Sequence, residues 1–207
     1  MNVIRVTEHN VDDAVQKASA LIRDGGIVAF PTETFYGIGT HYADETALRR
    51  IYTLKQRSTE HALPLLIGSK KLLKLVTPSI HDIAAMMMNR FWPGPLTILF
   101  PARSNLHNLI TAGTEKVAVR MPGGSIGLRL AQSLEFPITA TSANISGMPP
   151  AENADQVFRY FKDGIDLLID GGSTSGTLPS TIIDIIDNKI IIVRQGVIPK
   201  ADILHCS

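Results

Sequence analysis

Residues 26–39 read GIVAFPTETFYGIG, and this stretch sets the pattern for the rest of the chain. Gly26 to Phe30 is a short apolar run of the kind found in buried strands, and Pro31 ends it because proline has no N–H to donate to a strand ladder. We therefore expect a buried strand followed by a loop over residues 31–39, with Gly37 and Gly39 in a turn.

The segments on either side alternate between helix and strand signals. Apolar residues at helical spacing and glycine or proline boundaries predict helices over residues 11–22, 44–54, 69–75, 79–90, 125–134 and 153–161. Short apolar runs predict strands over residues 26–30, 65–67, 96–100, 117–120, 137–140, 167–169, 181–186 and 190–193. This order indicates an α/β or α+β domain with a central mixed sheet, whose last two strands are antiparallel around Asp187-Asn188.

Length and composition favour one folded, cytoplasmic domain over residues 1–207. The chain has 207 residues, of which 44% are hydrophobic and 19% charged, and such a chain buries one sizeable core. A net charge of +1 predicts neither a nucleic-acid nor a membrane partner. Secretory-signal and membrane-span patterns are absent, and the single cysteine, Cys206, excludes a disulfide framework and is expected to have no role.

Common catalytic motifs are also absent. The chain contains no phosphate-binding G-x-x-x-x-G-K-[ST] loop, and Gly37-Ile38-Gly39 lacks the third glycine of the dinucleotide motif. The histidines never pair at metal-ligand spacing, so no transition-metal site is expected. Without a G-x-S-x-G elbow or a Cys/His arrangement, covalent catalysis by the protein is disfavoured.

Polar and basic residues instead follow the predicted strand ends. They are Thr32, Glu33 and Thr34; Lys55 and Arg57; Arg120; Ser142 and Asn144; Ser180 and Thr181; and Arg194. Ligands bind in the crevice at strand ends of open α/β sheets, so these loops could converge on one site.

The cations among these residues allow two interpretations. Lys55 and Arg57 could meet one polyphosphate, or they could simply complement the dipole at a helix end. Arg120 and Arg194 close the buried strands VAVR and IIIVR, where a charge needs a partner. Ser142 and Asn144 could hold phosphate or ribose oxygens, or could serve ordinary turns.

Seven segments together resemble the threonylcarbamoyl-AMP synthase family, the YrdC-like proteins. They are FPTETFYGIG (30–39), LKQR (54–57), RFWPGPLTILFP (90–101), VAVRMP (117–122), TATSANISG (139–147), LPSTIIDI (178–185) and IIIVRQGVI (190–198). The resemblance is to the single-domain bacterial form, because the chain ends soon after the last segment. Ser58, where many relatives have proline, and Gly68, where a histidine often follows, depart from the family pattern.

This resemblance implies an open twisted α/β fold with flanking helices and a concave, positively charged groove. It assigns Lys55, Arg57, Ser142, Asn144 and Arg194 to the nucleotide site, with Lys55 and Arg57 as catalytic residues that neutralise the triphosphate. It assigns Thr32, Arg120 and Ser180 to threonine.

The implied reaction joins L-threonine, bicarbonate and ATP into threonylcarbamoyl-AMP with release of pyrophosphate. Such a reaction needs alignment and charge neutralisation more than a protein nucleophile, with Mg²⁺ bound mainly through phosphate oxygens. In the family the product passes to a transferase complex that modifies tRNA.

Two other functions remain open at this stage. The groove could bind double-stranded RNA or tRNA without catalysis, although the near-neutral charge argues against it. The chain could also act on carbamoyl phosphate during metalloenzyme maturation, as a related domain does. The acylphosphatase and zinc-finger segments expected beside that domain are absent.

Overall fold

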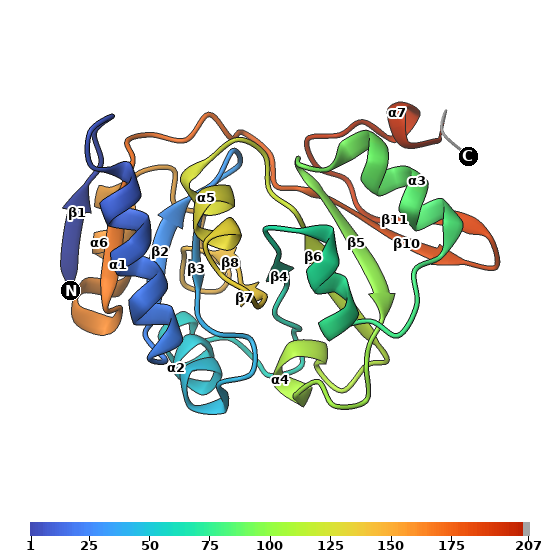
Figure 1. Ribbon diagram of the computed structural model, residues 1–207, viewed down its shortest axis with the longest axis horizontal. Helices are drawn as coiled ribbons and strands as arrows, with labels where there is room; N and C mark the ends of the chain where they lie inside the picture. The colour runs from blue at the N-terminus through green and yellow to red at the C-terminus, as the bar shows by residue number, and fades with distance from the viewer. Residues whose placement is uncertain (205–207) are drawn as a thin grey trace.

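The computed structural model describes residues 1–204 and contains two mixed β-sheets with helices packed on them (Figure 1). The five-stranded sheet has the order β1 (Asn2–Arg5), β9 (Leu167–Asp170), β2 (Val28–Pro31), β3 (Tyr36–Gly39) and β8 (Thr141–Ser142). The six-stranded sheet has the order β11 (Lys189–Arg194), β10 (Thr181–Ile186), β5 (Leu96–Pro101), β6 (Lys116–Arg120), β4 (Leu65–Leu66) and β7 (Ile138–Thr139).

Several of the helices begin where the sequence places capping residues. They are α1 (Val11–Arg23), α2 (Glu45–Lys55), α3 (Asp82–Phe91), α4 (Asn108–Thr111), α5 (Ile126–Gln132), α6 (Ala154–Phe161), α7 (Lys200–Leu204) and the 3₁₀ segments η1 (Lys70–Leu75) and η2 (Lys162–Gly164). Asp44 accepts the amide of Ala47 at 2.9 Å and so starts α2, while Ser125 accepts the amide of Leu128 at 3.2 Å and starts α5.

Segment 138–142 joins the two sheets. β7 lies at the edge of the six-stranded sheet and β8 at the edge of the five-stranded one, with only Ala140 between them. The amide of Thr139 also donates to the carbonyl of Thr40, just after β3. This arrangement brings the ends of β2, β3, β6 and β10 toward one central region.

The apolar faces of the elements bury two clusters. The larger contains Tyr36, Leu48, Trp92 and Phe100, and it joins α2, α3 and the six-stranded sheet. The smaller contains Ile22, Phe30 and Leu130, where α1 and α5 pack on the five-stranded sheet. The charged residues at the ends of these elements therefore lie at the sheet edges and on the surface.

The predicted loop over residues 31–39 is wrong in its second half. Residues 36–39 form β3, which pairs antiparallel with β2 so that Pro31 lies opposite Tyr36. Gly39 serves close packing here and is not in a turn, since a Cβ added to it would lie 1.9 Å from the carbonyl oxygen of Thr139. The remaining loop is the short stretch 32–35, which holds its side chains rigidly at the strand end.

Other expectations are confirmed or refined. The fold is mixed α/β as predicted, but it has two sheets in place of one central sheet, and β1, β8, α4, α7 and η2 were missed. The last two strands form the predicted hairpin, with Asp187 and Asn188 at φ of 50° and 60°. Gly68 packs on α5, where a Cβ would lie 2.3 Å from the carbonyl oxygen of Ala131. The expectation for Cys206 falls outside the described residues.

Candidate active site

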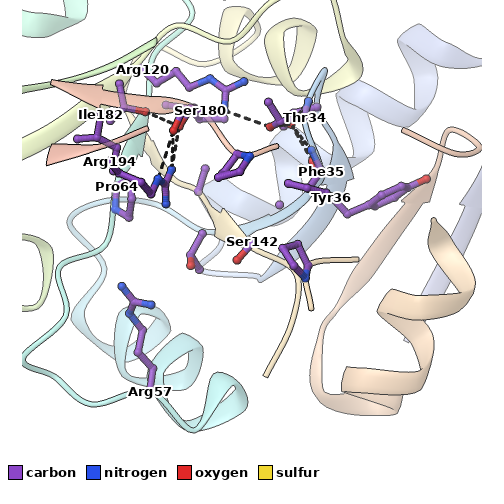
Figure 2. Close-up of a pocket in the computed structure, with 18 residues that line it drawn as sticks. Thr34, Phe35, Tyr36, Arg57, Pro64, Arg120, Ser142, Ser180, Ile182 and Arg194 are labelled. Carbon is purple, nitrogen blue, oxygen red and sulfur yellow. Dashed lines mark hydrogen bonds between the residues drawn. The ribbon is translucent and has the colours of Figure 1, made fainter. Parts of the chain in front are cut away.

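A cavity of about 290 Å³ lies where the two sheets meet (Figure 2). It is lined by Thr32, Thr34, Phe35, Tyr36, Gly37, Arg57, Pro64, Leu66, Thr97, Arg120, Ala140, Thr141, Ser142, Pro150, Pro179, Ser180, Ile182 and Arg194. Three of these residues are arginines and none of those named carries a carboxylate. The cavity therefore has the charge and the hydroxyl groups to hold an anion.

The turn between β2 and β3 places two threonine hydroxyls at the cavity. Thr32 Oγ1 donates to the carbonyl oxygen of Phe35 at 2.7 Å and accepts the amides of Thr34 and Phe35 at 3.2 and 3.3 Å. The hydroxyl of Thr34 lies 3.0 Å from that of Thr32. Thr32 thus uses its hydroxyl mainly to shape the turn, and Thr34 is the more available of the two.

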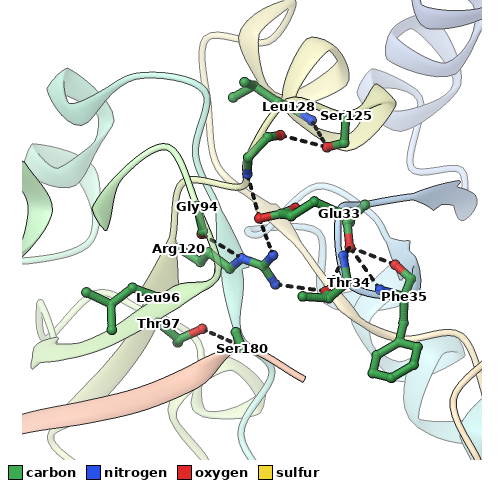
Figure 3. Close-up of polar contacts among 12 residues, drawn as sticks. Glu33, Thr34, Phe35, Gly94, Leu96, Thr97, Arg120, Ser125, Leu128 and Ser180 are labelled. Atoms are coloured by element: carbon green, nitrogen blue, oxygen red, sulfur yellow. Dashed lines mark hydrogen bonds and ion pairs between the residues drawn. The ribbon is translucent and has the colours of Figure 1, made fainter. Parts of the chain in front are cut away.

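Arg120, the last residue of β6, is 7% exposed and is held from several sides (Figure 3). Its Nε donates to the carbonyl oxygen of Gly94 at 3.1 Å, and its Nη1 donates to Thr34 Oγ1 at 3.3 Å. Its Nη2 lies 2.6 Å from Glu33 Oε1 as an ion pair, but the N–H bonds of Nη2 find no hydrogen-bond partner. The guanidinium is thereby fixed, with donor capacity left over.

Arg194, at the end of β11, lies beside the start of β10. Its Nη2 donates to the carbonyl oxygen of Ser180 at 2.9 Å and to Ser180 Oγ at 3.2 Å. Ser180 Oγ lies 2.8 Å from Thr97 Oγ1. Burial lowers the pKa of Arg194, and the charge of nearby Arg120 lowers it further. Two arginines therefore share one end of the cavity and repel each other.

Lys55 does not line this cavity. It is 1% exposed, and its ammonium donates to the carbonyl oxygens of Ser142 and Asn144, the latter at 2.7 Å, and lies 3.5 Å from Asn144 Oδ1. Burial lowers its pKa to about 7, with a smaller contribution from the charge of Arg57. The lysine thus joins the end of α2 to the loop after β8.

A second cavity of about 460 Å³ shares Arg57 and Ser142 with the first. Its other lining residues are Lys55, Ser58, His61, Asn144, Ser146 and Gly147. Arg57 donates to the carbonyl oxygens of His61 and Ala62 at 3.1 and 2.9 Å, and burial lowers its pKa. The loop 58–62 is therefore anchored on the guanidinium that borders both cavities.

The eight residues that the family resemblance assigns to the site all lie at these two cavities. Thr32, Arg57, Arg120, Ser142, Ser180 and Arg194 line the first, while Lys55 and Asn144 line only the second. Thr181 does not line either, since its hydroxyl donates to the carbonyl of Ile198 at 2.8 Å. Within residues 1–204 no group of three His, Cys, Asp or Glu is placed to hold a metal ion.

The sequence did not predict that the hydroxyl of Thr97 lines the cavity, or that apolar side chains form part of the cavity wall. Thr97 lies inside a predicted strand, and its outward direction could have been read from alternation along that strand. Leu66, Ala140 and Ile182 are ordinary strand residues, and nothing in their type marks them as cavity lining.

No helix within residues 1–204 has the length and hydrophobicity that a membrane crossing needs.

Comparison with known proteins identifies the fold and the family. The Sua5/YciO/YrdC family model, described as "Telomere recombination", matches residues 20–196. The threonylcarbamoyl-AMP synthase of Pyrococcus abyssi is 40% identical over 201 residues, which cover 97% of this chain and 59% of that protein. The enzyme of the same name from Idiomarina loihiensis is 32% identical over 183 residues, covering 86% of this chain and 96% of the relative.

A solved structure of P. abyssi Sua5 in complex with L-threonine is also similar. It superposes with a TM-score of 0.92 at 38% identity, covering 99% of this chain and 60% of that one. The chain therefore spans less than two thirds of the length of the P. abyssi relative.

Proposed function

The chain belongs to the Sua5/YciO/YrdC family, and from that premise we propose that it is a threonylcarbamoyl-AMP synthase. L-threonine, bicarbonate and ATP are the substrates of the proposed reaction, and threonylcarbamoyl-AMP and pyrophosphate are its products. The observation that carries the proposal is the joined pair of cavities, with arginines at both ends and no carboxylate among the lining residues named above.

Threonine is proposed to bind at the Arg120 end. A guanidinium can hold a planar carboxylate through two parallel hydrogen bonds, and Arg120 lines this end of the cavity. The hydroxyls of Thr34 and Ser180 border the same end and can meet the amino and hydroxyl groups of the ligand. Similarity to the protein whose structure contains L-threonine supports this assignment.

ATP is proposed to lie across the border between the cavities. Arg57 and Ser142 line both, so phosphates placed there would face one guanidinium and one hydroxyl. Arg194 would face the phosphates from the threonine side. Asn144 and the small residues Ser146 and Gly147 then remain for the nucleoside. Lys55 contributes its charge and the shape of the loop, because its N–H groups already point at protein oxygens.

The chemistry needs no nucleophile from the protein. Bicarbonate loses hydroxide to give CO₂, and the amine of threonine attacks its carbon, so that a C–N bond forms while a C=O π pair moves onto oxygen. The proton that the amine loses combines with the hydroxide to give water. An oxygen of the resulting carbamate attacks the α-phosphorus, and the bond from that phosphorus to the oxygen bridging to the β-phosphate breaks. Pyrophosphate leaves with the electron pair, and arginines close to its oxygens stabilise the developing negative charge.

Magnesium would enter as part of the ATP complex. Mg²⁺ prefers oxygen ligands and keeps several waters, and the cavity lining offers hydroxyls but no carboxylate among its named residues. The metal would therefore be held mainly by phosphate oxygens. Its role is to neutralise phosphate charge, while the arginines of the chain align the phosphates.

The wider setting is part of the same proposal. The product is a reactive mixed anhydride, so it must pass quickly to an acceptor, which we propose to be a cytoplasmic transferase complex that modifies tRNA. Binding of double-stranded RNA alone is a weaker alternative, because a net charge of +1 offers little attraction for a phosphate backbone.

The direct test uses the purified chain with ATP, Mg²⁺, bicarbonate and labelled threonine. Pyrophosphate release that requires both threonine and bicarbonate, together with the adenylate in the mass spectrum, is the expected result. Omitting threonine and omitting bicarbonate are the two controls. Pyrophosphate release at the same rate without threonine would overturn the proposal.

A further inference from the structure

Glu33 lies beside the guanidinium of Arg120 (Figure 3) and is not among the residues that line the cavity. Its Oε1 is 2.6 Å from Arg120 Nη2 and accepts the amide of Gly123 at 2.6 Å. Its Oε2 is buried and has no hydrogen-bond partner. Because Glu33 is not among the residues lining the cavity, any influence on a ligand there must pass through Arg120.

The arginine depends on this carboxylate for its orientation. The Arg120 side chain is long and flexible, and only planar alignment lets it grip a carboxylate at two atoms. Gly94 and Thr34 hold Nε and Nη1. Glu33 forms the ion pair with Nη2, and it carries the only opposite charge paired with Arg120 among the described residues.

The carboxylate also sets the charge at this end of the cavity. Arg120 and Arg194 are close enough for the charge of one to lower the pKa of the other. Glu33 balances one of these two positive charges, which leaves the other to attract an anionic ligand. Without Glu33, the charges of Arg120 and Arg194 would repel each other with no opposite charge paired to Arg120.

We propose that Glu33 is a positioning residue for amino-acid binding: it fixes Arg120 and offsets the repulsion from Arg194, so that the site accepts one carboxylate. The inference rests on the proposed function, since it takes threonine as the ligand. It assigns to the third residue of the P-T-E-T turn a role in binding that the residue performs without touching the ligand.

Gly123, next to the ion pair of Glu33 and Arg120, leaves room for the carboxylate of Glu33. A Cβ added at Gly123 would lie 3.0 Å from Glu33 Oε1, so a larger residue would push the carboxylate away from Arg120. A Cβ at the neighbouring Gly124 would meet nothing within 4 Å. The two glycines therefore form a matched pair of positions for a test.

The first experiment compares Glu33→Gln with the wild type by calorimetric titration with threonine and by steady-state kinetics. Gln keeps the size and the acceptor for Gly123 but removes the charge. We expect the threonine Kd and KM to rise about tenfold or more, as loss of one charge-assisted pair predicts, with the KM for ATP within about twofold of wild type.

Asp166→Asn is the matched control. Asp166 also accepts an amide, that of Ile27 at 2.7 Å, and pairs with an arginine, Arg50 at 3.1 Å, but it lies away from the cavity. This variant should leave threonine binding unchanged even if it unfolds more easily. Equal effects of both substitutions on threonine and ATP would mean that Glu33 is merely structural.

Gly123→Ala and Gly124→Ala give an independent readout that keeps the charge of Glu33. Gly123→Ala should weaken threonine binding in the same direction as Glu33→Gln, and Gly124→Ala should not. If the wild type binds threonine and Glu33→Gln binds it equally well, this inference fails while the proposed function stands. If the wild type itself binds no threonine, the proposed function fails first.

Discussion

The ammonium nitrogen of Lys55 lies 2.7 Å from the main-chain carbonyl oxygen of Asn144, so a buried positive charge joins the end of α2 to the loop after β8. Within residues 1–204 this lysine forms no ion pair. The carbonyl of Lys55 in turn accepts the amide of Ser146 at 2.8 Å. The lysine therefore contacts the loop through both its side chain and its main chain.

Replacing Lys55 with Met should destabilise the protein and weaken ATP binding. Methionine fills a similar volume, but it leaves the carbonyl oxygens of Ser142 and Asn144 without their donor. Leaving buried acceptors unsatisfied costs about 1–3 kcal/mol, which urea unfolding can measure. Wild-type stability with weaker ATP binding would instead indicate that Lys55 contacts the phosphates directly.

The same lysine should make stability depend on pH. Burial, and to a lesser degree Arg57, lowers its pKa from 10.5 to about 7 in the folded chain. Between these values the unfolded chain binds more protons at this residue, so its contribution to the free energy of unfolding rises with pH. The free energy of unfolding of the wild type should therefore increase relative to that of Lys55→Met as the pH rises above about 7. A difference that stays flat across this range would contradict the assignment.

Replacing Arg120 with Lys should weaken threonine binding while keeping the charge. Lysine has no planar fork, so it cannot make the paired hydrogen bonds to a carboxylate or keep the contacts to Gly94 and Thr34 together. We expect the KM for threonine to rise about tenfold to a hundredfold, corresponding to roughly 1.4–2.7 kcal/mol, with a small change in the KM for ATP. Equal increases in both KM values would assign Arg120 to the nucleotide.

Replacing Gly176 with Ala should disturb the end of the cavity at which threonine is proposed to bind. Segment 171–180 crosses from the five-stranded to the six-stranded sheet, and a Cβ at Gly176 would lie 1.6 Å from the carbonyl oxygen of Thr34 (Figure 1). Backbone atoms cannot rotate away, so the segment must move. Threonine affinity, measured by calorimetry, should fall about tenfold, whereas Ser175→Ala at an exposed neighbouring position should match wild type.

Much of this fold could be predicted because the local signals agree with the tertiary contacts. The capping carboxylate of Asp44 and the positive φ preference of Asp187-Asn188 mark a helix start and a hairpin, and both are present. Residues 36–39 were mistaken for a loop, because two glycines usually indicate a turn. Here Gly39 is required by the close approach of Thr139, which only tertiary structure reveals.

The sequence predicts which residues belong to the site better than it predicts what each side chain contacts. Charged residues at strand ends, such as Arg120 after the buried β6 and Arg194 at the end of the exposed edge strand β11, converge because those strands end at one region. The sequence does not reveal that Lys55 turns its ammonium toward protein oxygens, or that Glu33 lies beside the guanidinium of Arg120. Such directions depend on packing between segments far apart in the chain.

The most direct test of the account follows the carbon of bicarbonate into the product. Pure protein is incubated with ATP, Mg²⁺, threonine and carbon-13 bicarbonate. The adenylate is then isolated, and its molecular mass is measured by mass spectrometry. We predict a threonylcarbamoyl adenylate that is heavier by the single labelled carbon and formed in equal amount to pyrophosphate. An adenylate of unlabelled mass, or pyrophosphate formed without any threonine-containing product, would contradict the account.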